Sequence, residues 1–273
     1  MIIDGHAHSC GEFFEAEKII AKLDALKVDK VVLCPGVRNG PKGYGYLPGL
    51  ARILSKTDIT IKANKIIRIL SKIQKPADLL QTNEYVYSLQ LKHPDRIIQF
   101  FWADPDSNRI EADLHEKFES WGFKGIKLHQ CTQSFKWTSR GLDVITDFAR
   151  EKEMPVFIHL RSSGDIPEFI KLAGKYPEVS FIAAHLIGLE LFIRNKPLPK
   201  NVYFEISPTP LISPKRIQAA VDNFGADKVI LGSDTPYGRD NLCKNIRKVT
   251  RLKASDHHKE LILGGNLQGM LRL

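Results

Sequence analysis

A His-x-His pair stands near the start of the chain, in the sequence MIIDGHAH of residues 1–8. Side chains two residues apart in a β-strand point to the same side, so His6 and His8 would project together from one strand end. Two imidazoles held in this way can bind a divalent transition metal ion. Taken alone, the pair is equally typical of two ordinary surface histidines, and the rest of the chain has to decide.

Further residues of metal-binding type each follow a short apolar run. His129 follows GIKL, His159 follows VFI, His185 follows AA and Asp234 follows LGS. A single histidine at a strand end is more typical of a hydrogen-bonded core residue than of a ligand. The joint pattern reverses this preference, because three imidazoles and one carboxylate suit Zn²⁺ or a related metal ion with one position left for water.

Strand and helix patterns alternate along the whole chain. Short β-branched or apolar runs predict eight strands, at residues 1–8, 28–35, 96–103, 123–129, 155–160, 179–185, 201–206 and 228–232. Helical material follows each of them, and repeated βα units indicate a parallel sheet with right-handed crossovers. Eight units in about 250 residues predict an α/β fold, the closed (β/α)₈ TIM barrel, whose strands place active-site groups at their carboxyl ends. No linker divides residues 1–273, so a single domain is expected.

The alternation is interrupted once, after the second strand. Residues 38–49 are rich in Gly, Pro and Tyr, and two basic amphipathic segments follow as far as Pro76. This is much longer than the 2–6 residues of an ordinary βα loop. Residues 38–76 are therefore predicted to form a helical insertion, as a lid or side wall, before a helix at 77–92 restores the pattern.

The net charge of +9 raises the question of nucleic-acid binding. The basic residues are scattered through amphipathic segments, and neither a run of five basic residues nor a nucleic-acid motif is present. A solvated basic surface is the better interpretation, with attraction of an anionic small substrate as an addition. The sequence therefore predicts no nucleic-acid partner.

Cysteine usage and hydropathy predict a cytoplasmic protein. The four cysteines are widely spaced and form no C-x-x-C motif, which suits a reducing compartment. The N-terminus lacks the basic and apolar regions of a secretory signal. The longest largely apolar run, 181–193, is shorter than the ~20 residues that span a bilayer, so no membrane partner is expected.

Six segments resemble, in order and spacing, the amidohydrolase superfamily, and within it the amidohydrolase-related (amidohydrolase 2) branch of metal-dependent hydrolases and non-oxidative decarboxylases. The resemblance covers nearly the whole chain. Its segments are IDGHAH at 3–8, GFKGIKLH at 122–129, PVFIH at 155–159, AHL at 184–186, ILGSDTP at 230–236 and GNL at 265–267.

The resemblance implies roles for the strand-end residues. The metal ligands would be His6, His8, His159 and Asp234. His185 would be either a catalytic group beside the metal or a ligand in a two-metal site. Lys127 lies on the strand where two-metal relatives carry a bridging carboxylated lysine, but in this branch that lysine is usually no bridge. One ion is therefore favoured, Zn²⁺, with two ions or another divalent transition metal as alternatives.

The implied chemistry is metal-assisted. A bound cation lowers the pKa of its water from about 15.7 toward ~7. Asp234 would accept the proton of this water, and His185 would polarise the attacked oxygen or protonate the leaving group. Asp4, on the same face as His6 and His8, would orient a ligand from behind.

The sequence says less about the substrate, which is expected to be a small and polar or anionic molecule. Arg161, Lys127 and His129 are the candidate substrate-binding residues. The leading hypothesis is hydrolysis of a small amide, lactone or ester, and the alternative is non-oxidative decarboxylation or hydration of a small carboxylic acid. A phosphotriesterase-like or deaminase-like enzyme, a silent barrel used for binding, and a homo-oligomer also remain open.

Overall fold

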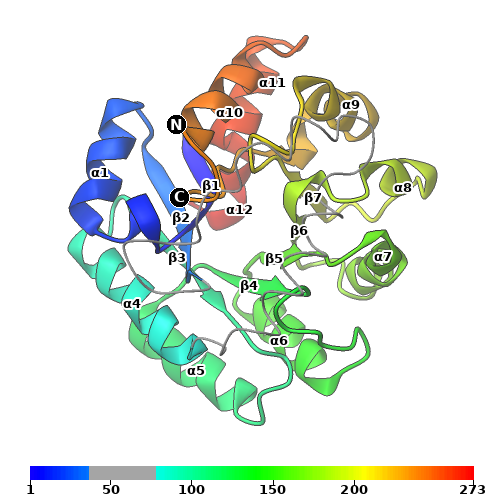
Figure 1. Cartoon of the computed structure of the whole chain (residues 1–273). Helices are drawn as coiled ribbons and strands as arrows, with labels where there is room; N and C mark the ends of the chain where they lie inside the picture. Colours follow the sequence, from blue (N-terminus) through cyan, green and yellow to red (C-terminus); the bar gives the residue numbers. More distant parts are fainter. Residues whose placement is uncertain (37–77) are drawn as a thin grey trace.

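The computed structural model of the chain describes residues 1–36 and 78–273. The insertion predicted at 38–76 lies outside these described residues, and so does the first residue of the helix predicted at 77–92. Within the described part, helices surround a ring of strands in the view of Figure 1.

The eight strands form one sheet in which neighbours in the chain are neighbours in space. They are β1 (Ile3–His8), β2 (Lys30–Cys34), β3 (Ile97–Trp102), β4 (Gly125–His129), β5 (Val156–His159), β6 (Phe181–Ala183), β7 (Val202–Glu205) and β8 (Val229–Ile230). Their order is β1-β2-β3-β4-β5-β6-β7-β8, and every pair is parallel.

The ring closes between β1 and the segment that follows β8. The Gly5 N–H donates to the Leu231 carbonyl (2.9 Å) and the His8 N–H donates to the Thr235 carbonyl (2.8 Å). A Cβ atom on Gly5 would lie 2.7 Å from that Leu231 oxygen, so this approach requires a glycine. The predicted (β/α)₈ TIM barrel is thereby confirmed.

The helices lie outside the sheet and cover it. They are α1 (Ala16–Ala25), α4 (Leu79–Lys92), α5 (Ile110–Trp121), α6 (Arg140–Glu151), α7 (Ile166–Lys175), α8 (Leu189–Arg194), α9 (Pro214–Phe224), α10 (Asn241–Thr250), α11 (Asp256–Glu260) and α12 (Asn266–Leu271). Local sequence sets several starts: the side chains of Asp78, Ser139 and Ser213 accept hydrogen bonds from the first-turn N–H groups of α4, α6 and α9.

The strands are buried on both faces, as expected of a parallel barrel. Residues such as Phe123, Phe169 and Phe204 pack between the sheet and the helices. A smaller group that includes Phe100 and Phe157 fills the interior of the barrel. No helix among the described residues is both long and apolar enough to cross a membrane.

Two strands, β6 and β8, end two residues earlier than their sequence pattern predicts. β6 stops at Ala183, and His185 and Leu186 adopt left-handed backbone conformations with φ of 62° and 47°. β8 contains only Val229 and Ile230 instead of residues 228–232. In both places the chain turns away from the sheet just before a residue of the predicted site.

The closure at Gly5 gives a stability prediction. Gly5→Ala places a methyl group against Leu231 and Ile230, and overpacking of this kind should cost about 1–3 kcal/mol. Urea unfolding would measure it. Gly269→Ala is the matched control, because a Cβ there meets no atom within 4 Å and removing a helical glycine should stabilise by up to ~1 kcal/mol. Equal midpoints for Gly5→Ala and the native chain would contradict the closure argument.

Candidate metal centre

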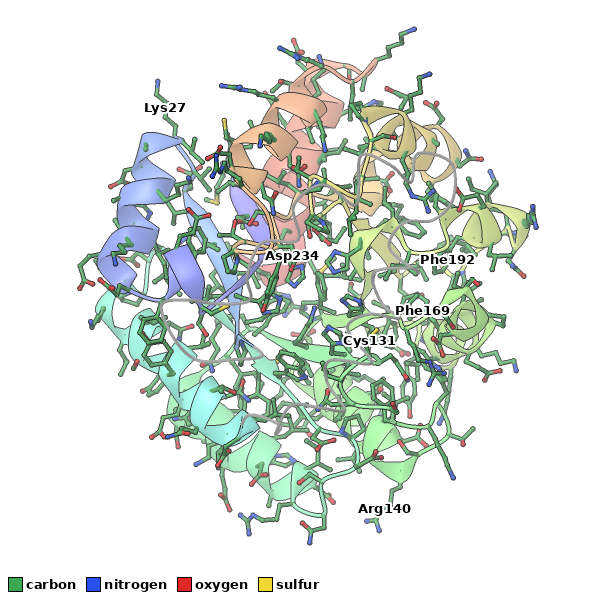
Figure 2. The ribbon with its side chains drawn as sticks, in the orientation of Figure 1. Lys27, Cys131, Arg140, Phe169, Phe192 and Asp234 are labelled. Atoms are coloured by element: carbon green, nitrogen blue, oxygen red, sulfur yellow. The ribbon has the colours of Figure 1, made fainter. Side chains whose placement is uncertain are left out.

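Three predicted ligands meet at the carboxyl end of the barrel. His6 Nε2 lies 3.1 Å from His8 Nε2, and Asp234 Oδ1 lies 3.4 Å from His8 Nε2 and 3.8 Å from His6 Nε2. All three residues are buried, and Asp234 is labelled near the centre of the molecule in Figure 2. Strand β1 and the segment after β8 therefore supply one group of converging candidate ligand atoms.

The spacing of these atoms fits one transition metal ion. Two nitrogen ligands at 2.0–2.1 Å from a tetrahedral Zn²⁺ stand roughly 3.3 Å apart, close to the two shorter separations. The rings of His6 and His8 are inclined at 66°, so their planes intersect and both lone pairs can point at one ion. The donor set of two imidazoles and a carboxylate also suits other divalent transition metals.

Hydrogen bonds on the far side of each ring fix its orientation. His8 Nδ1 lies 2.7 Å from the Pro35 carbonyl, which accepts the ring proton and leaves the Nε2 lone pair facing His6 and Asp234. His6 Nδ1 lies 3.4 Å from Ser207 Oγ and 3.7 Å from Glu205 Oε2. These partners are the basis for assigning a proton to Nδ1 of each ring.

Asp4 is buried one step deeper on β1, where it holds the loop that carries Asp234. Its carboxyl group accepts hydrogen bonds from the Ser233 N–H (2.8 Å) and the Ser233 hydroxyl (2.6 Å). Burial raises the pKa of Asp4 to about 7, although the bonds from Ser233 oppose the rise. Asp4 therefore orients Asp234 through its chain neighbour Ser233, and it also accepts a hydrogen bond from the backbone N–H of His6 (3.3 Å).

The fourth predicted ligand, His159, is not part of the trio. Its Nδ1 atom lies 3.1 Å from His185 Nε2, and its ligand atoms group with those of His129 and Cys131. His129 and His159 are register partners on β4 and β5, and their rings stack at 4.0 Å with an angle of only 13°. A single ion cannot lie in two nearly parallel ring planes, so this second group is no ready-made metal site.

His185 links the two groups. Its Nδ1 donates to the Ser207 carbonyl (2.7 Å), and its backbone N–H donates to Glu205 Oε2 (3.1 Å). Burial by itself lowers the pKa of His185, but the charges of Asp234 and Glu205 outweigh burial and raise it. The pKa of His185 therefore lies above the usual value of a histidine, unlike that of its imidazole neighbours His6 and His159.

Burial keeps His6, His129 and His159 neutral, whereas Asp234 is ionised. Burial, joined by the charge of Lys127, holds the pKa of His6 and of His129 well below the usual value, and burial beside His129 does the same for His159. Burial alone would raise the pKa of Asp234, but His185 and His8 lower it. Neutral imidazoles and a carboxylate are the forms that bind a metal ion.

Two predicted substrate-binding residues flank the centre. Lys127 is fully buried, with Nζ 3.2 Å from His6 Nε2 and 4.0 Å from the Phe157 ring centroid, and burial lowers the pKa of its amine. Arg161 is partly exposed beyond β5 and pairs with Asp165 at 3.0 Å. Asp165 also accepts a hydrogen bond from Trp137 Nε1 (3.2 Å), and this bond holds Asp165 in place beside Arg161.

Sequence reasoning overlooked Glu205 and Ser207. Glu205 is the last residue of β7 and is completely buried, next to both His6 and His185. Its position at a strand end, after the apolar run VYF, was a signal of the same kind as that of His129 and His159. Polar residues at the ends of five strands were predicted to belong to the site, and the end of the seventh strand was not among them.

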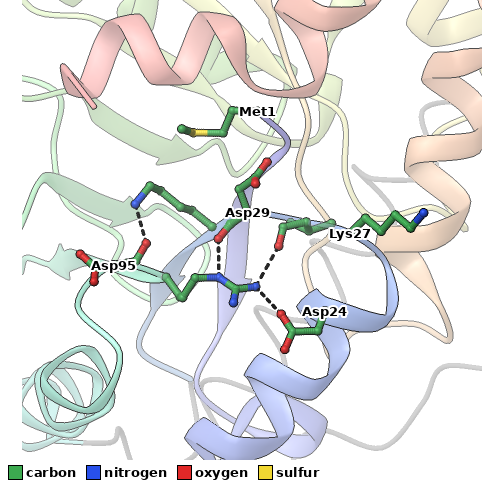
Figure 3. A pocket seen from close by; sticks show the side chains of 8 residues that line it. Met1, Asp24, Lys27, Asp29 and Asp95 are labelled. Atoms are coloured by element: carbon green, nitrogen blue, oxygen red, sulfur yellow. Dashed lines mark hydrogen bonds and ion pairs between the residues drawn. The ribbon is translucent and has the colours of Figure 1, made fainter.

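A hollow lies at the opposite end of the barrel, among the amino-terminal ends of β1, β2 and β3 (Figure 3). Arg96 spans it, donating to Asp24 Oδ1 (2.7 Å) and to the carbonyls of Asp29 (2.6 Å) and Val28 (3.1 Å). In a TIM barrel, polar groups at this end serve stability and the carboxyl end carries the chemistry. The hollow is therefore a structural feature of the barrel bottom.

Comparison with known proteins agrees with this geometry. A model of the amidohydrolase family matches residues 63–272. No curated protein matches the chain. Among solved structures, 4-oxalomesaconate hydratase from Rhodopseudomonas palustris is 17% identical, with 100% of this chain and 96% of that chain covered and a TM-score of 0.66.

Two further structures show the same fold. A 5-carboxyvanillate decarboxylase from Novosphingobium aromaticivorans, complexed with manganese, is 16% identical over 100% of this chain and 96% of that chain (TM-score 0.67). A probable 2-pyrone-4,6-dicarboxylic acid hydrolase from Acinetobacter baumannii, with citric acid bound, is 13% identical over 100% and 99% (TM-score 0.69). The likeness at these identities concerns the fold, whereas the family match spans well over half of the residues, and the chain therefore belongs to the amidohydrolase family.

Proposed function

We propose that this protein is a metal-dependent hydrolase that uses an activated water to cleave a small amide, lactone or ester. The observation that carries the proposal is the convergence of His6 Nε2, His8 Nε2 and Asp234 Oδ1 at the buried carboxyl end of the barrel. One ion of Zn²⁺, or of another divalent transition metal, is the proposed cofactor. When bound, such an ion acidifies water and polarises a carbonyl group.

Different residues around the ion are proposed to accept and to donate protons. Asp234, held as a carboxylate, is the proposed acceptor of the water proton. His185 is the proposed donor to the leaving group, and Nε2 is the donating atom because Nδ1 is committed to the Ser207 carbonyl. His159, 3.1 Å from that Nε2, is placed to exchange a proton with it or to turn toward the ion as the fourth ligand.

The substrate is proposed to be small and polar or anionic. Lys127, beside His6 at the floor of the site, is suited to contact the oxygen of a polarised carbonyl. Arg161 offers a guanidinium group, held by Asp165, that matches the geometry of a carboxylate. His129 forms part of the wall through its stack on His159.

A second candidate function is non-oxidative decarboxylation or hydration of a small carboxylic acid. It is favoured by the solved structures of the same fold, which include a decarboxylase with manganese and a hydratase. The same ligands serve both reactions, since an acid next to the ion can protonate carbon as well as a leaving group. Release of CO₂ from candidate carboxylic acids, against release of an alcohol or amine from esters and amides, separates the two.

The metal content of the purified protein tests whether the site binds a metal ion. We expect the purified protein to bind about one divalent ion per chain, to lose it to a chelator and to regain it on dialysis against Zn²⁺ or Mn²⁺, as measured by plasma mass spectrometry. His8→Ala should weaken binding by more than the ~10–100-fold typical of partners outside the ligand shell. A native protein that cannot be loaded with any of these ions would overturn the proposal.

Substitution of Asp234 tests the proton step. Asp234→Asn keeps the shape but removes the base, and kcat on the identified substrate should fall roughly 10²–10⁴-fold. Asp227→Asn is the matched control, since Asp227 is exposed and pairs only loosely with Lys228 (3.8 Å). A kcat of Asp234→Asn equal to that of the control would rule out the assigned role.

A further inference from the structure

We propose that Glu205 is a positioning residue that sets the orientation of His6 and His185 and the proton position of His6. This inference rests on the proposed metal-dependent function and adds to it a group that touches neither ion nor substrate. Glu205 acts from behind the two imidazoles, on the side of each ring that faces away from the ligand trio or from His159.

The carboxylate ties together two turns at the barrel mouth. Oε1 accepts a hydrogen bond from the Ser207 N–H (2.6 Å) and Oε2 accepts one from the His185 N–H (3.1 Å). The second bond holds His185 in its left-handed backbone, with φ of 62°. A non-glycine residue in that region is strained unless its surroundings favour it. The hydrogen bond from the His185 N–H to Glu205 stabilises this backbone conformation.

The same carboxylate faces the rings. Oε2 lies 3.7 Å from His6 Nδ1 and 3.4 Å from His185 Nδ1. Ser207 Oγ completes the group at 3.4 Å and 3.2 Å from the same two nitrogens. A negative acceptor on the Nδ1 side keeps the ring proton there, so the His6 Nε2 lone pair faces His8 and Asp234.

The packing around Glu205 supports a specific role for its charge. The side chain is fully buried, and burying a carboxylate is costly unless its partners compensate. The barrel makes room for it: a Cβ on Gly232 would lie 2.1 Å from Glu205 Oε1. An apolar residue would fill this space at lower cost but would leave the N–H groups of His185 and Ser207 unpaired.

Glu205 is not assigned as a ligand, although its oxygen lies within 4.8 Å of nitrogens of His6 and His185. The nitrogens that face it are the Nδ1 atoms, whereas the trio uses Nε2 of His6. An ion at Glu205 would need the His6 ring to bridge two ions after losing both protons. An Nδ1–H directed at Glu205 and Ser207 needs no such step.

The test compares Glu205→Gln with the native protein. Gln keeps an acceptor oxygen but removes the charge and adds N–H donors that oppose those of the backbone or of the rings. Affinity for Zn²⁺, measured by competition with a chromophoric chelator, should fall ~10–100-fold, as for other groups behind metal-bound histidines. The matched control is Glu190→Gln, which removes an exposed acid of α8 that pairs with Arg216 and should leave the affinity within about twofold.

Nuclear magnetic resonance of the ¹⁵N-labelled histidine side chains gives a second measurement that needs neither metal nor turnover. The metal-free native protein should show His6 as the Nδ1–H tautomer, and Glu205→Gln should shift this population. If Glu205→Gln does not fold, Ser207→Ala removes the second acceptor alone and should move both measurements in the same direction by a smaller amount.

The outcomes separate the two ideas. A folded Glu205→Gln protein with native affinity and an unchanged His6 tautomer would overturn the positioning role and leave the proposed function standing. A native protein that binds no divalent ion would overturn the proposed function, while the tautomer measurement would still decide on Glu205.

Discussion

The site depends on the contact that closes the barrel between β1 and the turn after β8. Besides the bonds from Gly5 and His8, the His6 carbonyl accepts hydrogen bonds from the N–H groups of Ser233 (3.1 Å) and Asp234 (2.7 Å). Two segments more than 220 residues apart in the chain are thereby joined by their backbones. The predicted ligands His8 and Asp234 come together because the main chains that carry them are already paired, and no long side chain has to be ordered.

Burial gives the site its electrostatic character. Removing imidazoles from water holds His6, His129 and His159 neutral, which is the form that binds a metal ion. At His185 the charges of Asp234 and Glu205 outweigh the effect of burial and raise the pKa. One region of low dielectric therefore lowers the pKa of three imidazoles, while nearby carboxylates raise the pKa of a fourth.

The candidate site residues are held by hydrogen-bond and charge partners on the side away from the site. Pro35 accepts from His8, Ser207 and Glu205 face His6, and Ser233 connects Asp4 to the loop of Asp234. Such partners fix which nitrogen of each ring carries a proton. In a TIM barrel, one fold serves different reactions because the loops at the carboxyl ends of the strands vary.

Periodicity and residue type by themselves determined the eight βα units and placed His6, His8 and Asp234 at strand ends. These features are local, since strand length, helical spacing and the type of a residue at a strand end can be read without knowing its neighbours in space. The family resemblance rested on the same segments, and the match to the amidohydrolase family model confirms it.

The tertiary structure decided what depends on neighbours in space. In the sequence, the carboxylate at the end of β7 looks like any polar residue at a strand end. Only the folded barrel, which brings β1 and the end of β6 close to β7, shows that Glu205 faces His6 and His185. Register across β4 and β5 stacks His159 on His129 and separates it from the other predicted ligands. Sequence fixes which side of a strand a histidine points to, whereas the turn of its ring is set by the groups that pack against it.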